Sequence, residues 1–317
     1  MQTCPESTAS LISVMGISMG DEGKGRVVHE ILEEIESVSG KPAAGVMKVN
    51  GGANAGHTAA GLKLNLLPSG VGNPRVPQLL IGAGVVADPR KFLWEAKPLE
   101  ARGLSVLSRL IIDEKTQVSD LSHRLLDLAW EDYRIKQLGM ENRGSTGRGI
   151  SPAYSDETGQ WQMFYLAFKQ DRKGFSSALQ GRIQRATDTI RHVCKVSEKD
   201  WFSFFETLTE AEKRANEDSI AGEIFSPDEF DFLRFRTNEP YALNLELLEE
   251  VYWQAGVELV SCIGDIRPFL LGHRPSSQPI VAEFGQAYWL DKRHGFTPNV
   301  TASHTTGSEL FHSGGIP

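Results

Sequence analysis

The segment that most constrains the fold is residues 18–26, SMGDEGKGR, a glycine-rich loop between two regular elements. The residues before it, LISVMGIS at 11–18, are short and mostly apolar, as in a buried parallel strand. The residues after it place apolar side chains at helical spacing, at Val27, Val28, Ile31, Leu32 and Ile35. Strand, glycine loop and helix in this order are typical of proteins that hold a phosphate group at the start of the helix.

The loop is a degenerate form of the phosphate-binding pattern G-x-x-x-x-G-K-[ST]. Gly20, Gly23 and Gly25 allow successive N–H groups to point into one concavity, and Lys24 adds a full positive charge. Gly25 stands where a hydroxyl residue normally binds Mg²⁺, and we expect the carboxylate of Asp21 to replace that hydroxyl. An ordinary glycine turn with a solvated lysine is the alternative. The flanking strand and helix favour the phosphate site.

Strand and helix patterns alternate along the rest of the chain. Further strands are predicted at residues 45–50, 79–89, 107–115, 256–265 and 279–286. Roughly residues 160–255 are acidic, aromatic and helical. The alternation predicts an α/β fold with a mostly parallel central sheet, flanking helices, P-loop-like binding of a nucleoside triphosphate and a helical insertion. We expect one domain over residues 1–317, with residues 160–255 as a helical subdomain.

The helical insertion carries three candidate capping boxes and a set of aromatic residues. The boxes pair Ser197 with Asp200, Thr209 with Glu212, and Ser226 with Glu229, the last with Pro227 at the first helical position. Aromatic residues on helix faces usually pack inward, so we expect a core and not a ligand box from Trp201, Phe202, Phe204, Phe205, Phe230 and Phe232.

Three more polar, glycine-rich clusters follow predicted strands or lie near their ends. In NGGANAGHT, residues 50–58, Asn54 can hydrogen-bond a base or phosphate and His57 can donate to a phosphoryl oxygen, although a histidine that caps a turn is the alternative. Thr146 and Arg148 in NRGSTGRGISPAYSDE, residues 142–157, suit an anion loop or a mobile surface loop. Gln286 ends the EFGQ strand. Ligand sites of open α/β sheets gather at strand carboxyl ends, so we expect one shared site.

Composition narrows the class of protein. The 41 acidic residues outnumber the 33 basic ones, which argues against a protein that binds nucleic-acid backbones. Three widely spaced cysteines, Cys4, Cys194 and Cys262, lack metal-ligand spacing and are interpreted as reduced thiols. No apolar run is long enough to span a bilayer, and the N-terminus does not read as a signal peptide. We therefore expect no membrane partner and a cytoplasmic location.

The four clusters together resemble the adenylosuccinate synthetase family. The family reads G-x-x-W-G-D-E-G-K-G-K, GG-x-NAGHT and G-T-T-G-R-G-I-G-P-A-Y where this chain has GISMGDEGKGR, GGANAGHT and GSTGRGISPAY. The segment AEFGQAYWLDKRHGFTPNVT matches a fourth family motif in register. The matches are colinear and cover most of residues 11–154 and 279–306.

The resemblance implies a ligase that joins aspartate to IMP with GTP and Mg²⁺, through phosphorylation of O6 of IMP. It implies that Asp21 takes the N1 proton of the purine and binds Mg²⁺ together with the carbonyl of Gly56, and that His57 donates toward the transferring phosphoryl group. It implies catalytic roles for Asp21, Lys24, His57 and Gln286, and nucleotide binding by Gly20, Glu22, Gly23, Gly25, Asn54, Thr58, Thr146, Arg148 and Thr301. A homodimer with shared sites is also implied.

The chain departs from the family pattern at three places. Met19 replaces the loop tryptophan, and Gln160 stands about where the family has an arginine that reaches the partner subunit, with Lys169 or Arg172 as candidate substitutes. The chain ends at Pro317, before the family segment that binds aspartate and reads the donor base.

Three alternatives to an IMP-specific ligase therefore remain. One is a phage-type enzyme that makes 2-aminodeoxyadenylosuccinate from dGMP, and the choice between GTP and ATP as donor stays open for the chain in either case. That branch carries serine in place of the catalytic aspartate, so Asp21 favours IMP. The second is a truncated nucleotide-binding protein without ligase activity. The third, an ordinary P-loop NTPase, is disfavoured by Gly25.

Overall fold

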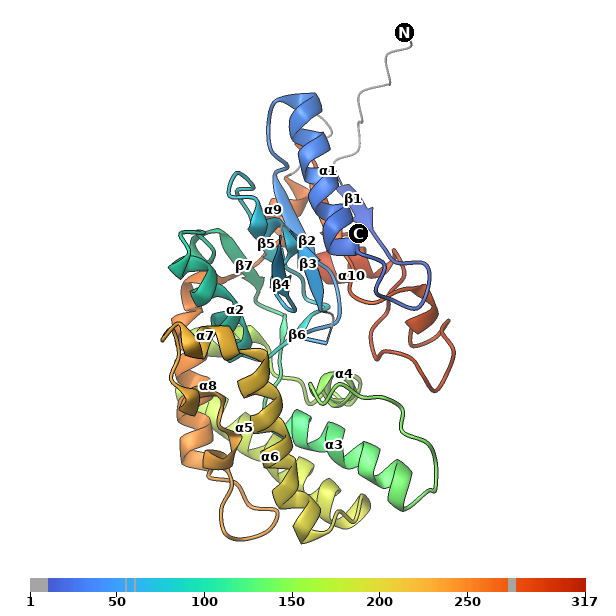
Figure 1. The fold of residues 1–317 in the computed structure, drawn as a ribbon, viewed down its shortest axis with the longest axis vertical. Helices are drawn as coiled ribbons and strands as arrows, with labels where there is room; N and C mark the ends of the chain where they lie inside the picture. The colour runs from blue at the N-terminus through green and yellow to red at the C-terminus, as the bar shows by residue number, and fades with distance from the viewer. Residues whose placement is uncertain (1–10, 55, 60, 273–277) are drawn as a thin grey trace. The chain divides into compact units, whose positions relative to one another are not determined.

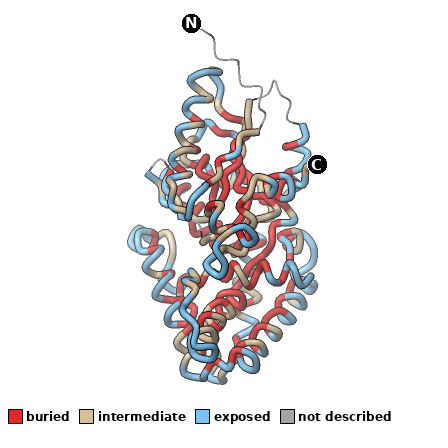
Figure 2. Tube along the Cα trace, turned by 90° about the vertical axis from the view of Figure 1, so that its right-hand side faces the viewer, coloured by how far each residue is buried: buried red, intermediate tan, exposed pale blue. Residues whose placement is uncertain are grey.

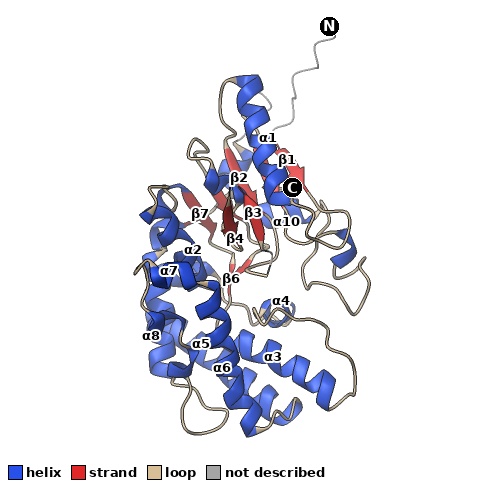
Figure 3. Ribbon diagram, viewed as in Figure 1, coloured by secondary structure: helices blue, strands red, loops and turns tan. Residues whose placement is uncertain are grey.

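The computed structural model describes residues 11–54, 56–59, 61–272 and 278–317 (Figure 1). The chain forms two compact units. The first comprises Met1–Val85, Leu104–Thr116 and Gly264–Pro317, and the second comprises Val86–Gly103 and Gln117–Ile263. Most strands belong to the first unit, and the second is built mainly of helices (Figure 3).

The first unit is organised around a six-stranded sheet with the order β1-β10-β2-β5-β7-β9. The registered pairs from β1 to β7 are all parallel. This confirms the predicted mostly parallel central sheet. The strands are β1 Leu11–Val14, β10 Ile280–Glu283, β2 Gly45–Lys48, β5 Leu79–Ile81, β7 Leu110–Asp113 and β9 Ile263–Gly264.

Helices cover both faces of this sheet. Helix α1, Lys24–Ser39, packs Val28 and Leu32 against Val46 of β2 and Val281 of β10. On the opposite face, Met47 joins a cluster that includes residues from the short helices α9, Arg267–Leu271, and α10, Glu309–Gly314. Because successive side chains of a strand alternate between faces, the mostly apolar strands supply both cores. Buried segments accordingly run through the strands, and exposed segments lie on the outer faces of the helices (Figure 2).

Smaller elements complete the first unit. Strands β3, His57–Ala59, and β4, Leu62–Leu64, form an antiparallel hairpin after the second glycine cluster. Short 3₁₀ helices span Ser69–Gly72, Leu107–Arg109 and Tyr288–Leu290.

The second unit contains a two-stranded parallel sheet of β6, Val86–Ala87, and β8, Gln117–Val118, and seven α-helices within the described residues. The helices are α2 Pro89–Ala101, α3 Leu121–Lys136, α4 Ile150–Thr158, α5 Arg172–Asp188, α6 Glu198–Ala215, α7 Glu217–Ala221 and α8 Leu245–Glu258. Short 3₁₀ helices span Tyr165–Lys169, Pro227–Phe230, Phe232–Phe235 and Val260–Cys262, and one π-helical turn spans Thr189–Val193.

The aromatic residues predicted as core lie in the interior of this unit. Five of the six are buried, namely Trp201, Phe204, Phe205, Phe230 and Phe232, whereas Phe202 is half-buried beneath Arg236. The described cysteines, Cys194 and Cys262, are buried and are not joined in a disulfide within the described residues, and Cys4 lies outside those residues. None of the described helices is long and apolar enough to cross a membrane.

Several predicted elements were wrong. The single strand at residues 79–89 is two strands of different sheets, and Asp88 caps α2 with Pro89 at its first position. Most of residues 256–265 belongs to the end of α8 and a 3₁₀ turn, because a short apolar run fits a buried helix end as well as a strand.

The three capping boxes had different outcomes. Ser197 caps α6, as predicted. Thr209 lies inside α6, where its hydroxyl accepts from the main-chain N–H of Phe232, so the second box was wrong. Ser226 caps a 3₁₀ helix with Pro227 at its start, and Glu229 accepts from the indole of Trp94.

Asp120 anchors the start of α3 within the second unit. Its buried carboxylate accepts from the N–H of Ser122 at 2.8 Å and from Nη1 of Arg182 at 2.9 Å. Burial alone would raise the pKa of Asp120, but the charges of His123 and Arg182 and these hydrogen bonds lower it to about 2 from an ordinary 3.8. The ionised carboxylate therefore stabilises the fold above pH ~4, and this contribution is lost as the pH falls through 2.

We expect Asp120→Asn to lower the free energy of unfolding by about 2 kcal/mol at pH 7, because asparagine keeps a good cap but removes the charge. The difference from the unsubstituted protein should shrink below pH 4. Urea denaturation at several pH values measures it, and a difference that stays constant down to pH 2 would contradict the role given to the charge.

Candidate nucleotide site

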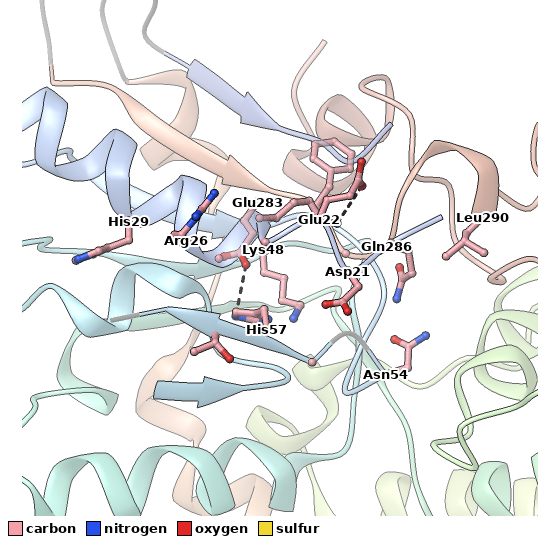
Figure 4. Close-up of a pocket in the computed structure, with 18 of the residues that line it drawn as sticks. Asp21, Glu22, Arg26, His29, Lys48, Asn54, His57, Glu283, Gln286 and Leu290 are labelled. Atoms are coloured by element: carbon pink, nitrogen blue, oxygen red, sulfur yellow. Dashed lines mark ion pairs between the residues drawn. The ribbon is translucent and has the colours of Figure 1, made fainter. Parts of the chain in front are cut away.

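A cavity of about 760 Å³ opens in the first unit at the carboxyl ends of β1, β10 and β2 (Figure 4). Three of the four predicted clusters meet there, and their strands explain why. The cavity is lined by all four predicted catalytic residues, Asp21, Lys24, His57 and Gln286, and by the predicted binding residues Gly20, Glu22, Gly23, Gly25, Asn54, Gly56 and Thr58.

Glu22 folds the glycine loop. Its Oε1 accepts from the main-chain N–H of Ile17 at 2.9 Å and of Ser18 at 3.0 Å. Burial opposes these hydrogen bonds, yet together with Lys24 they lower the pKa of Glu22. A Cβ at Gly16 would lie 2.0 Å from Oε2 of Glu22, 2.8 Å from Cβ of Ala287 and 3.0 Å from the carbonyl oxygen of Gln286, so the loop needs glycine there. The Glu22 carboxylate is therefore occupied by its own loop, and its predicted contact with a nucleotide stays a prediction.

The start of α1 faces the cavity. Gly23 caps the helix in the left-handed conformation, with φ of 69°, and no side chain caps the first turn. The helix begins at Lys24, within the glycine loop and before the first apolar residue, Val27, of its helical pattern. Burial lowers the pKa of Lys24, and the nearby Glu22, Glu283 and Asp21 oppose that shift. Uncapped N–H groups and an ammonium group at one helix start form an anion site.

Gly25 lets this helix start lie against β3. A Cβ at position 25 would lie 2.8 Å from the carbonyl oxygen of Thr58 and 3.2 Å from Oγ of Ser69. The replacement of the usual hydroxyl residue therefore has a packing reason. A serine at this position would collide with main chain, and main chain cannot move at low cost.

Asp21 is exposed and projects into the cavity (Figure 4). Its backbone has φ of 54°, a conformation that residues other than glycine seldom adopt. Gly20 on one side has φ of 99°, so the loop reverses direction at this point. Such strained positions concentrate at functional sites, where the surrounding structure holds them.

His57 lies beside a buried carboxylate that the sequence interpretation missed. Nε2 of His57 lies 3.4 Å from Oε1 of Glu283. Both oxygens of Glu283 are fixed by Ser69, through its N–H and its hydroxyl, each at 2.8 Å. A carboxylate with a fixed position orients the imidazole ring. The available signal was an acidic residue at the end of the apolar strand IVAE, which has no packing role.

Lys48 is a second missed residue that lines the cavity. It ends β2, is 1% exposed, and donates from Nζ to the carbonyl of Asn65 at 2.5 Å. In the sheet register it pairs with Glu283 of β10, so both side chains leave the same face. The signal was a lysine inside the buried strand GVMK.

Two amide side chains, Asn54 and Gln286, also line the cavity and lie near Asp21 (Figure 4). Oδ1 of Asn54 accepts from the N–H of Gly52 at 3.2 Å, which leaves its NH₂ group for a ligand. Gln286 has φ of 56°, and its Nε2 is buried without a hydrogen-bond partner among the described residues. Buried donors without partners usually mark a missing ligand or water.

Three predicted residues lie elsewhere. Thr301 does not line this cavity, and its buried Oγ1 lacks a hydrogen-bond partner within the described chain. Thr146 and Arg148 belong to the second unit, where Arg148 pairs with buried Glu212. Burial, with the neighbouring Arg124, lowers the pKa of Arg148 to about 10. The expectation that their cluster follows a strand was wrong, because it follows helix α3 and runs into α4.

The cavity offers hard oxygen donors for a divalent cation. Asp21 supplies a carboxylate and Gly56 a main-chain carbonyl, and both line it. Within the described residues, no group of three or more His, Cys, Asp or Glu side chains could hold a metal. Mg²⁺ in nucleotide sites is commonly held by one or two carboxylates plus the phosphates, so this donor set fits that ion.

A parallel sheet with a glycine loop, an uncapped helix start and a lysine at its carboxyl edge is the architecture of α/β proteins of the phosphate-loop kind. The model of the adenylosuccinate synthetase family matches residues 13–223. The chain belongs to this family, as its four motifs predicted.

Named relatives agree with this assignment. The chain is 32% identical to adenylosuccinate synthetase of Vibrio parahaemolyticus over 96% of its own length and 57% of the relative's. It is 41% identical to that of Polaromonas naphthalenivorans over 48% of this chain and 32% of the relative. A solved structure of adenylosuccinate synthetase from Plasmodium falciparum has a TM-score of 0.70 with 22% identity, covering 98% of this chain and 59% of that one, so the fold is shared. The chain thus spans little more than half the length of these relatives.

We expect Gly25→Ala to destabilise the first unit by about 1–3 kcal/mol, because its Cβ meets the carbonyl of Thr58. Gly181→Ala is the matched control, since a Cβ there has no atom within 4 Å and the residue lies inside α5. Thermal denaturation should show a lower melting temperature for the first variant and an unchanged or higher one for the control. Equal melting temperatures for both variants would contradict the packing role of Gly25.

Proposed function

We propose that this chain is a carbon–nitrogen ligase that joins aspartate to C6 of a purine monophosphate, IMP, at the expense of GTP. The carrying observation is that Asp21, Lys24, His57 and Gln286 line one cavity, although three separate segments supply them. An ordinary NTPase needs the phosphate loop alone, whereas the other two segments supply a histidine and two amides suited to a second nucleotide.

The start of α1 would hold the phosphates of GTP. Gly20, Gly23 and Gly25 leave N–H groups open to the cavity, and Lys24 supplies charge. Thr58 and Glu22 are assigned to the same nucleotide by their motif positions. Asp21 and the carbonyl of Gly56 would hold Mg²⁺, which when bound neutralises charge on the phosphates.

The 6-oxopurine would lie between Asp21 and Gln286. The Asp21 carboxylate would take the N1 proton, which makes O6 nucleophilic toward the γ-phosphorus of GTP, and GDP leaves. The amine of aspartate then attacks C6, and phosphate departs from the 6-phosphoryl intermediate. Asn54, Thr146, Gln286 and Thr301 are assigned to the purine nucleotide, and Arg148 is assigned to nucleotide binding without a choice between the two nucleotides.

His57 would donate a hydrogen bond to the transferring phosphoryl group. Glu283 supports this role, since Ser69 fixes both of its oxygens and it lies 3.4 Å from the imidazole. Positioned donors are the main protein contribution to phosphoryl transfer. We also propose a single family domain over residues 1–317, a homodimer and a cytoplasmic location.

The alternatives concern substrate and activity. A dGMP-specific enzyme with GTP or ATP as donor would use the same cavity, and Asp21 favours IMP over it. A nucleotide-binding protein without turnover would also keep the cavity. Incubation of the protein with IMP or dGMP, GTP or ATP, Mg²⁺ and aspartate separates the three, with the succinylated product followed by its absorbance. Formation of product from IMP supports the proposal, and binding without product from either purine contradicts it.

Asp21→Asn should reduce turnover by at least about 100-fold, because an amide cannot accept the N1 proton. The side chain is exposed and its size is kept, so the melting temperature should stay within a degree or two. Retained turnover would contradict the proposed base.

Glu283→Gln should lower kcat by about 10–100-fold with little change in KM, since an amide no longer holds the imidazole of His57 by charge. His29→Gln is the control, because His29 lines the same cavity but pairs with exposed Glu33 of its own helix. Steady-state kinetics of both variants measure the effect. Equal kcat values for the two variants would contradict the role of Glu283.

A further inference from the structure

A series of hydrogen-bonded polar groups runs from Asn50, two residues after the end of β2, to the amide of Gln286. Asn50 is fully buried, and its Oδ1 accepts from the N–H of Gly285 at 2.8 Å. Its Nδ2 donates to the carbonyl of His304 at 2.8 Å and to Oγ of Ser303 at 3.1 Å. A main-chain N–H can only donate and a main-chain carbonyl can only accept, so the orientation of the Asn50 amide is fixed.

Ser303 links the Asn50 amide to the Gln286 amide by hydrogen bonds. Its hydroxyl is 1% exposed and has one hydrogen to donate. Because Asn50 donates to Oγ, that hydrogen is left for Oε1 of Gln286, which lies 3.4 Å away. Oε1 of Gln286 is therefore the acceptor, and Nε2 is the group left without a partner in the described structure.

We propose that Asn50 and Ser303 are positioning residues that fix the polarity of the Gln286 amide. The inference rests on the proposed function, in which Gln286 faces the purine. With Oε1 engaged by Ser303, Gln286 offers an N–H donor to the ligand. A donor at this place prefers a 6-oxo group, which accepts, over a 6-amino group, which donates.

Gly51 leaves space for the side-chain amide of Gln286. A Cβ at position 51 would lie 3.1 Å from Oε1 and 3.2 Å from Nε2 of Gln286. Gln286 has a left-handed backbone conformation and directly follows Gly285, whose N–H donates to Oδ1 of Asn50. One closed set of contacts thus holds both the backbone and the side chain of this residue.

One substitution can reverse the direction of the hydrogen bonds that link Asn50, Ser303 and Gln286. In Asn50→Asp both carboxylate oxygens accept, so the hydrogen bond to the carbonyl of His304 is lost and the Ser303 hydrogen turns toward the aspartate. Ser303 then accepts from Nε2 of Gln286, and Oε1 becomes the group offered to the ligand. Ser303→Ala removes the link without imposing a direction.

The experiment measures the affinities of the full chain for IMP and AMP by calorimetry and compares their ratio among variants. Asp21 is present in all variants and favours IMP equally in each. A change in the ratio of the IMP and AMP affinities therefore reports the polarity of the Gln286 amide. Ser303→Ala should reduce the preference for IMP by about threefold to tenfold, and Asn50→Asp by more. Thr305→Val is the control, because the hydroxyl of this buried residue donates to the carbonyl of Ala287 and not to Gln286. Ratios in both variants equal to that of the control would overturn the proposal.

A ligand-free measurement separates this inference from the proposed function. The side-chain ¹⁵NH₂ signal of Gln286, assigned by its loss in Gln286→Glu, should shift in Asn50→Asp and Ser303→Ala but not in Thr305→Val. If the signal shifts in these two variants and the protein shows no ligase turnover, the polarity of the Gln286 amide is supported and the proposed function is refuted. An unshifted signal in a protein with full turnover would overturn the role of Asn50 and Ser303 alone.

Discussion

The register of three parallel strands sets the whole candidate site. Val14 of β1, Glu283 of β10 and Lys48 of β2 are aligned as neighbours, so three strands end at one level and their next residues enter one cavity. Residues at one level of a sheet project from the same face, and here that face carries α1. A shift of β10 by one residue would turn Glu283 toward the opposite apolar cluster and separate it from His57. The chemistry therefore depends on strand pairing before it depends on any loop.

The buried charges explain why this pairing needs polar support. Glu283 and Lys48 are almost inaccessible to water, and isolated charges there would be very costly. Ser69 supplies two donors to Glu283, and the carbonyl of Asn65 accepts from Lys48. A protein under no functional constraint would more economically place apolar residues at such positions. Their retention beside an anion site is consistent with an interior built to meet a charged ligand.

The sequence predicted those parts of the site that local patterns encode. A glycine loop between an apolar strand and an amphipathic helix identified Asp21 and Lys24, and glycine clusters at strand ends identified His57 and Gln286. Glu283 was missed because a single acid in an apolar strand acquires meaning only when the strand lies between β1 and β2, which are far from it in sequence. The strand predicted at residues 256–265 failed for a related reason. Its apolar run packs as the end of α8, and tertiary contacts decide between helix and strand in such runs.

The two acids in the proposed phosphate loop have separate physical explanations. Glu22 turns inward and accepts hydrogen bonds from two main-chain N–H groups of its own loop, so its carboxylate stabilises the conformation of the loop. Asp21 faces the cavity instead, and its backbone has a conformation that residues other than glycine seldom adopt. Its charge would repel a bare phosphate, and a cation or the N1 proton of a purine is what makes such a carboxylate favourable there. The repulsion thus discriminates against phosphate bound alone, and a loop of this kind is suited to a reaction that needs two nucleotides together.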